Sequence, residues 1–196
     1  MKIDKEQKKV LWAFVISIIL FTIIFVLQGN FEFIGYVVVV LLLFWALWSS
    51  SKHVFYPNFV LWGLFLWAFL HMLGGVAMSN GKVVYTKMLI PIIGAPYSVL
   101  KYDQVVHALG FFVATLVMYY VLKKYLKEDF GWVAVGIVVA MAGLGLGALN
   151  EIVEFIMTVV LPNTNVGGYE NTAIDLISNF VGAVLAVFYL KNKVKK

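Results

Sequence analysis

Six ionisable residues lie inside long apolar segments or at their ends, where a charged side chain is costly. They are His71, Asp103, His107, Glu151, Glu154 and Asp175, and the amides Asn150 and Asn179 lie beside them. A charge at the centre of a transmembrane helix costs about 2.5–3.5 kcal/mol on insertion scales, which makes such residues functional candidates by default. Imidazole and carboxylate donors without sulfur suit Zn²⁺, Mn²⁺ or Fe²⁺. They suit Mg²⁺ or Ca²⁺ if the imidazoles do not bind the ion directly.

The spacing of these residues predicts that they meet. Three pairs are separated by three or four positions and so share a helix face: Asp103 with His107, Glu151 with Glu154, and Asp175 with Asn179. We counted about 1.5 Å per residue along each segment, starting from the end that lies opposite the polar groups. On this count the polar groups lie about 18–33 Å along their helices. Four helices therefore bring polar groups into one layer, and bundles build metal sites from such inward-pointing pairs. We expect one cavity lined by all six ionisable residues.

Each group would have its own role in a metal-assisted reaction. The expected metal ligands are His71, Asp103, His107 and Asp175. Glu151 or Glu154 would act as the general base, and a bound ion would polarise a carbonyl or phosphoryl oxygen. Lys101 would meet an anionic head group. The cofactor would be a divalent ion, with Zn, Mn, Mg and Ca as the candidates.

Structural explanations stand beside these roles. Asp103 and Asp175 lie near the starts of their segments, where a carboxylate offsets the helix dipole. A plain hydrogen bond to Asp103 would explain His107, and His71 would be explained by a place at the membrane interface. The glycines Gly143, Gly145 and Gly147 precede the two glutamates and would let another helix approach closely or permit a kink.

The composition indicates which elements position these residues. The chain has 196 residues, of which 63% are hydrophobic and 13% charged, whereas soluble domains average about 25% charged residues. These values exclude a soluble globular enzyme. The chain has no Cys, and all 15 of its basic residues are Lys, so it has neither a thiolate metal site nor the bidentate anion clamp of Arg. The bilayer explains the net charge of +5 better than nucleic acid does, and we expect no nucleic-acid partner.

Six apolar runs are long enough to cross a bilayer core of about 30 Å. They are Val10–Leu27, Phe33–Trp48, Phe55–Leu73, Tyr102–Leu122, Trp132–Val160 and Thr172–Leu190. The first is too long for a signal peptide and lacks a cleavage site, so we expect it to be retained. The sequence predicts an all-α, polytopic membrane protein with a six-helix transmembrane bundle. Residues 1–196 would form one domain, with two accessory helices in 1–54 and the His and carboxylate residues in 55–196.

The lysines predict the orientation. Twelve of the fifteen lie at the two ends of the chain and in the second and fourth connections, and the other three are Lys82, Lys87 and Lys101. Cytoplasmic loops carry the excess of Lys and Arg. We therefore expect a multi-pass protein of the cell membrane with both termini in the cytoplasm and the polar layer on the extracytoplasmic side.

The connection between the third and fourth runs is unusual. It contains the apolar stretch Met88–Tyr97, which is too short to span the membrane and is interrupted by Pro91 and Pro96. We expect a re-entrant or interfacial segment that lies over the outer face of the bundle without crossing.

The ordered motifs resemble those of two families. His71 before Gly74 and Gly75, Tyr102-Asp103 before His107, Glu151-x-x-Glu154-Phe, and a last Asp-bearing helix resemble the YjdF-like family of uncharacterised bacterial inner-membrane proteins. The last motif, Asp175-x-x-x-Asn179-x-x-Gly-Ala, also resembles the VanZ-like family, which is linked to teicoplanin resistance. Gln104 stands where the YjdF-like pattern has Arg, and Phe155 where it has Trp, so a role that depends on guanidinium does not transfer. The resemblance implies a site rather than a reaction.

Three functions remain open from the sequence. The first is a metal-dependent hydrolase or transferase that acts on a lipid-linked or envelope substrate. The second is a non-catalytic envelope protein that binds lipid or serves as a scaffold. The third is a proton- or cation-coupled transporter, which the nearly apolar cytoplasmic half of the spans disfavours. The lipid bilayer is the expected partner in all three, and the sequence indicates no oligomeric state.

Overall fold

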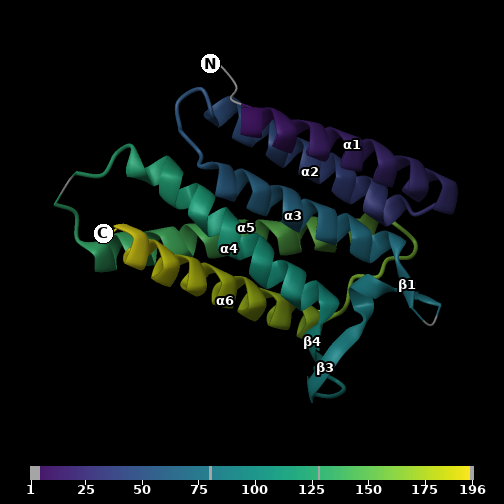
Figure 1. Cartoon of the computed structure of the whole chain (residues 1–196). Coiled ribbons are helices and arrows are strands. Elements are labelled where there is room, and N and C mark those ends of the chain that lie inside the picture. The colour runs from purple at the N-terminus through teal and green to yellow at the C-terminus, as the bar shows by residue number, and fades with distance from the viewer. Residues whose placement is uncertain (1–4, 80, 128, 195–196) are drawn as a thin grey trace.

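Six long helices make up most of the computed structural model, which describes residues 5–79, 81–127 and 129–194 (Figure 1). They are α1 (Lys5–Gln28), α2 (Phe31–Ser50), α3 (Asn58–Val76), α4 (Tyr102–Lys123), α5 (Trp132–Val160) and α6 (Tyr169–Val194). Each is long and apolar enough to cross a membrane. The predicted fold class is confirmed, although α2 begins at Phe31 rather than Phe33 and α6 at Tyr169 rather than Thr172.

The helices run between two distinct ends of the bundle. We call one the terminal end, because α1 begins and α6 ends there, together with the connections 51–57 and 124–131 (Figure 1). We call the other the hairpin end. It holds the turn 29–30, the segment 77–101 and the connection 161–168.

Two small antiparallel hairpins stand between α3 and α4. Strand β1 (Met78–Ser79) pairs with β2 (Lys82–Val83), the 3₁₀ helix η1 (Val84–Thr86) follows, and β3 (Met88–Ile93) pairs with β4 (Val99–Lys101). As expected, Met88–Tyr97 does not form a transmembrane helix. It is a β-hairpin that extends sideways from the bundle (Figure 1). Five of the six β3 residues are exposed, so β3 does not pack over the bundle as a covering segment would.

Gln104 fixes the entry into α4. Its side-chain oxygen accepts the backbone N–H groups of Leu100 at 2.6 Å and Lys101 at 3.0 Å, and its amide donates to the Ser98 carbonyl at 3.2 Å. Leu100 has a φ of 76°, in the left-handed region that side chains other than Gly rarely adopt. The three hydrogen bonds hold this turn, which places Lys101 and Asp103 at the start of α4.

Buried apolar side chains form two clusters. One joins α1, α2, α3 and the η1 region and includes Phe25, Phe33, Tyr36, Met72 and Tyr85. The other joins α3, α4, α5 and α6 and includes Val60, Leu116, Tyr119, Val139 and Leu190. The second cluster fills the half of these four helices nearer the terminal end with apolar side chains.

Glycines allow α4, α5 and α6 to approach one another closely. A Cβ at Gly182 of α6 would collide with the backbone carbonyl of Ala108 in α4. A Cβ at Gly143 would collide with Thr115, and one at Gly147 would press on Asn179, whereas Gly145 has nothing within 4 Å of that position. Two of the three predicted α5 glycines therefore face a neighbouring helix.

Candidate functional site

His107 lies where α4, α5 and α6 meet. It is buried, with 3% of its surface exposed. Its Nδ1 is 3.0 Å from Asn179 Oδ1 on α6 and 3.6 Å from Glu151 Oε1 on α5. Its Nε2 is 3.6 Å from Glu154 Oε1, also on α5. Both ring nitrogens therefore face oxygen atoms, and the close packing at Gly147 and Gly182 makes this convergence possible.

Three of the predicted site residues present ligand atoms to a common point. One donor atom each from His107, Glu154 and Asp175 lies within 4.8 Å of the others, and all three residues are buried. An ion with bonds of about 2.0–2.5 Å holds its ligand atoms up to about 4–5 Å apart. An imidazole and two carboxylates from three helices therefore fit a divalent cation in both chemistry and spacing.

Unpartnered oxygens support this fit. Neither carboxylate oxygen of Glu151 has a hydrogen bond in the described structure, and Asp175 Oδ1 has none either. Glu151 is 7% exposed and Asp175 is 1% exposed. Buried polar atoms without partners are rare in folded proteins, and each needs an explanation such as an ion or a reacting group. Asp175 is itself one of the three residues, and Glu151 Oε1 lies 3.6 Å from Nδ1 of His107, another of the three.

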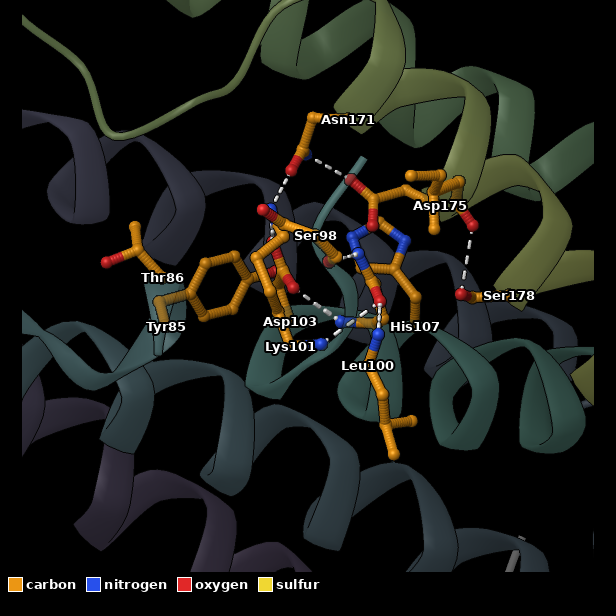
Figure 2. A network of polar contacts seen from close by, with 12 residues as sticks. Tyr85, Thr86, Ser98, Leu100, Lys101, Asp103, His107, Asn171, Asp175 and Ser178 are labelled. Atoms are coloured by element: carbon orange, nitrogen blue, oxygen red, sulfur yellow. Dashed lines mark hydrogen bonds and ion pairs between the residues drawn. The ribbon is translucent and has the colours of Figure 1, made fainter. Parts of the chain in front are cut away.

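A polar chain borders the site toward the hairpin end (Figure 2). Lys101 Nζ is 3.2 Å from Asp103 Oδ2 and also donates to the side-chain oxygen of Asn171. The Asn171 amide in turn donates to Asp175 Oδ2. Asp103 Oδ1 accepts the Gln104 backbone N–H at 2.7 Å. The structure thus places Asp103 in an ion pair at the border of the site, outside the group of three donors.

His71 lies apart from that group, in an aromatic enclosure. Its Nδ1 is 3.1 Å from the hydroxyl of Tyr85, and its ring packs against those of Phe33, Tyr36 and Trp67. Burial raises the pKa of Tyr85 well above its usual value, so the hydroxyl keeps its proton and can donate to His71.

The two predicted amides hold the central side chains. Asn150 donates to Glu154 Oε1 at 2.9 Å, one turn along α5, and Asn179 faces His107 Nδ1. These contacts fix the carboxylate and the imidazole in orientations that point toward each other, as residues behind metal ligands do.

Sequence reasoning missed two parts of the polar layer. Glu32 of α2 is 5% exposed and accepts hydrogen bonds from the backbone and side chain of Asn165, at 2.8 and 2.9 Å. The expected span began at Phe33, which left Glu32 outside it as a loop residue. Tyr85 lies in the short 3₁₀ helix η1 between the two hairpins, where α-helical spacing gives no signal.

Comparison with known proteins identifies the family. The model of the family DUF2238, described as predicted membrane protein, matches residues 9–196. This confirms the resemblance to the YjdF-like family, which is DUF2238, and gives no support to the VanZ-like resemblance. No curated protein and no solved structure was found to match the chain. The chain belongs to the DUF2238 family.

Proposed function

We propose that this member of the DUF2238 family of predicted membrane proteins binds one divalent cation through His107, Glu154 and Asp175. The observation that carries the proposal is the meeting of three donor atoms within 4.8 Å. In addition, both carboxylate oxygens of Glu151 and Oδ1 of Asp175 are buried and accept no hydrogen bond from the described residues. Because one donor is an imidazole, Zn²⁺ or Mn²⁺ suits the group better than Mg²⁺ or Ca²⁺.

The lysines support an orientation with the site on the extracytoplasmic side of the cell membrane. Eleven of the fifteen belong to the two ends of the chain or to the connections at the terminal end, and a twelfth, Lys123, is the last residue of α4 at that end. The positive-inside rule then puts the terminal end in the cytoplasm and the hairpin end outside. The polar layer, which reaches the starts of α4 and α6 at the hairpin end, would serve a substrate from the outer leaflet.

The reaction that fits the site best is hydrolysis or group transfer on a lipid-linked or envelope substrate. A bound cation would polarise a carbonyl or phosphoryl oxygen and lower the pKa of a water molecule. Glu154 contributes a donor atom, so Glu151 is the better general base: its two oxygens accept no hydrogen bond in the described structure, and Oε1 lies 3.6 Å from His107 Nδ1. Lys101, held by Asp103 and Asn171 at the border, would meet an anionic head group.

One observation favours a second candidate, a cation centre that binds without catalysis. His107, Glu154 and Asp175 are all at most 5% exposed, and deeply buried donors are typical of closed structural metal sites. Such a centre would tie α4, α5 and α6 together in a protein that binds an envelope lipid or a partner. A transporter fits less well, because apolar side chains fill the described core nearer the terminal end.

Metal analysis of the purified protein tests the proposal. We expect about one Zn²⁺ or Mn²⁺ per chain after purification in detergent and reconstitution with the metal. Asp175→Asn should lose the ion, whereas Glu170→Gln should keep it, because Glu170 lies on the same helix and is exposed. Equal metal content in the two variants, or no metal in the unaltered protein, would refute the proposal.

A further inference from the structure

A recess lined by both polar and apolar groups opens at the hairpin end, and Lys101 is not among its lining residues. Its volume is about 550 Å³, and it lies between the α1–α2 turn, the end of α3 with the first hairpin, and the α5–α6 connection. We call it the Glu32 pocket. Its polar lining consists of Gln28, Asn30, Glu32, Asn163 and Asn165.

The carboxylate of Glu32 is held there by neutral donors. Asn165 donates to Oε2 from its backbone at 2.8 Å and from its side chain at 2.9 Å. The Tyr36 hydroxyl lies 3.4 Å from Oε1, a long hydrogen bond that leaves this oxygen able to accept another. Among the described residues, no Lys or His forms an ion pair with this 95%-buried side chain. Buried charges are normally paired, so Glu32 lacks a cationic partner.

The other residues that line the pocket favour a positively charged ligand over a negatively charged one. The other polar lining groups are amides, and no basic side chain is found among the described lining residues. An anion would therefore be repelled. Phe31, a lining residue that is 68% exposed, offers an aromatic ring, to which a cation is attracted.

We propose that the Glu32 pocket binds a primary ammonium group, such as the one that ends an ethanolamine phospholipid or a free alkylamine. The ammonium would donate a charge-assisted hydrogen bond to Glu32 Oε1. Phe31 and Met78 would form an apolar rim of the pocket that contacts the lipid phase; Met78 is 61% exposed. The site is separate from the proposed divalent-cation centre and uses none of its ligands, so either can exist without the other.

Lipid titration of the purified protein tests this. The protein in detergent with EDTA would be titrated with short-chain phosphatidylethanolamine, phosphatidylcholine and phosphatidylglycerol, and binding would be read by native mass spectrometry. We expect at least about tenfold preference for the ethanolamine lipid, since choline has no N–H donor and glycerol no cation. Glu32→Gln should reduce binding by about tenfold or more, whereas Glu170→Gln, at an exposed carboxylate of the same end, should not change it.

Free ethanolamine distinguishes the two sources of the ammonium. Competition at concentrations near that of the lipid would support a soluble amine as the ligand, and lack of competition would support the lipid head group. Equal binding of the three lipids, or unchanged binding in Glu32→Gln, would overturn the proposal. So would Ca²⁺ binding that depends on Glu32 in the absence of ethanolamine-lipid binding. If Glu32→Gln does not fold, Phe31→Leu replaces it. That variant should weaken binding severalfold, and an unchanged affinity would refute the pocket's role.

Discussion

Replacing Gly182 by Ala should separate α4 and α6, two of the three helices that build the centre. A Cβ at this position of α6 would collide with the Ala108 carbonyl oxygen of α4 and lie close to the Phe112 amide nitrogen. These obstacles are backbone atoms, which cannot move aside as a flexible side chain can. The helices must therefore move apart.

The size of the effect follows from two opposing contributions. Overpacking costs about 1–3 kcal/mol, and contact with backbone favours the upper end of that range. Ala has a higher helix propensity than Gly, so the same substitution also stabilises the helix by up to about 1 kcal/mol. The net loss is about 2 kcal/mol, or about 4–8 °C in the melting temperature of a chain of this length. Asp175 and Asn179 would move with α6, so Zn²⁺ affinity should fall by about tenfold or more.

Gly145→Ala is the matched control for this substitution. It makes the same chemical change inside α5 at a position with nothing within 4 Å of the new Cβ. The Gly145→Ala protein should be at least as stable as the unaltered protein and should bind Zn²⁺ with the same affinity. Thermal unfolding followed by circular dichroism in detergent, and isothermal titration with Zn²⁺, give the two readouts. A Gly182→Ala protein as stable as the Gly145→Ala protein would refute the close α4–α6 contact.

Three further predictions concern the centre and the segment before it. Glu154→Gln should abolish Zn²⁺ binding in calorimetric titrations, because it removes a ligand atom. Glu151→Gln should weaken Zn²⁺ binding by only about tenfold. Equal losses of affinity in the two variants would contradict this assignment of ligands. Gln104→Ala removes three hydrogen bonds, which together contribute about 2–3 kcal/mol to stability. Amide hydrogen exchange at residues 98–101 should therefore become faster. Unchanged exchange rates would show that the turn does not depend on Gln104. Ile92 is apolar and 64% exposed, and we expect it to face lipid. A nitroxide attached at Ile92→Cys, which would be the only cysteine in the sequence, should therefore collide more often with oxygen than with a polar nickel complex in liposomes. The reverse order would place the hairpin in water.

The sequence was sufficient to predict the spans and the existence of a polar layer. Hydropathy locates apolar runs, and a helix converts residue count into depth, so convergence of polar groups on α4, α5 and α6 could be anticipated. The i,i+3 and i,i+4 spacings also placed Glu151 with Glu154 on a common face, and both residues lie next to His107.

Rotation about the helix axes and long-range partners could not be predicted from spacing. His71 and His107 have similar depths, but His107 forms close contacts with the carboxylates of α5, whereas His71 faces Tyr85 of the short 3₁₀ helix η1. Asp103 shares a face with His107, yet Lys101 at the turn before α4 draws its carboxylate into an ion pair. That turn depends on the hydrogen bonds of Gln104, which helical periodicity does not reveal.

Glu32 shows how a boundary error removes a residue from consideration. A shift of two residues at the start of α2 changes this carboxylate from an exposed loop group into a buried one. Its hydrogen-bond partner, Asn165, lies 133 residues away in the chain, so no local pattern connects them. Such contacts become visible only once α2 and the α5–α6 connection are placed together.

Anomalous diffraction from crystals of the Zn²⁺-loaded protein, collected on both sides of the zinc absorption edge, tests the proposed cation centre most directly. We predict one peak per chain between α4, α5 and α6, within about 2.0–2.2 Å of His107, Glu154 and Asp175. The peak should be absent from the Asp175→Asn protein. No peak at this point in the loaded, unaltered protein, or a peak bound only by residues outside these three, would contradict the centre.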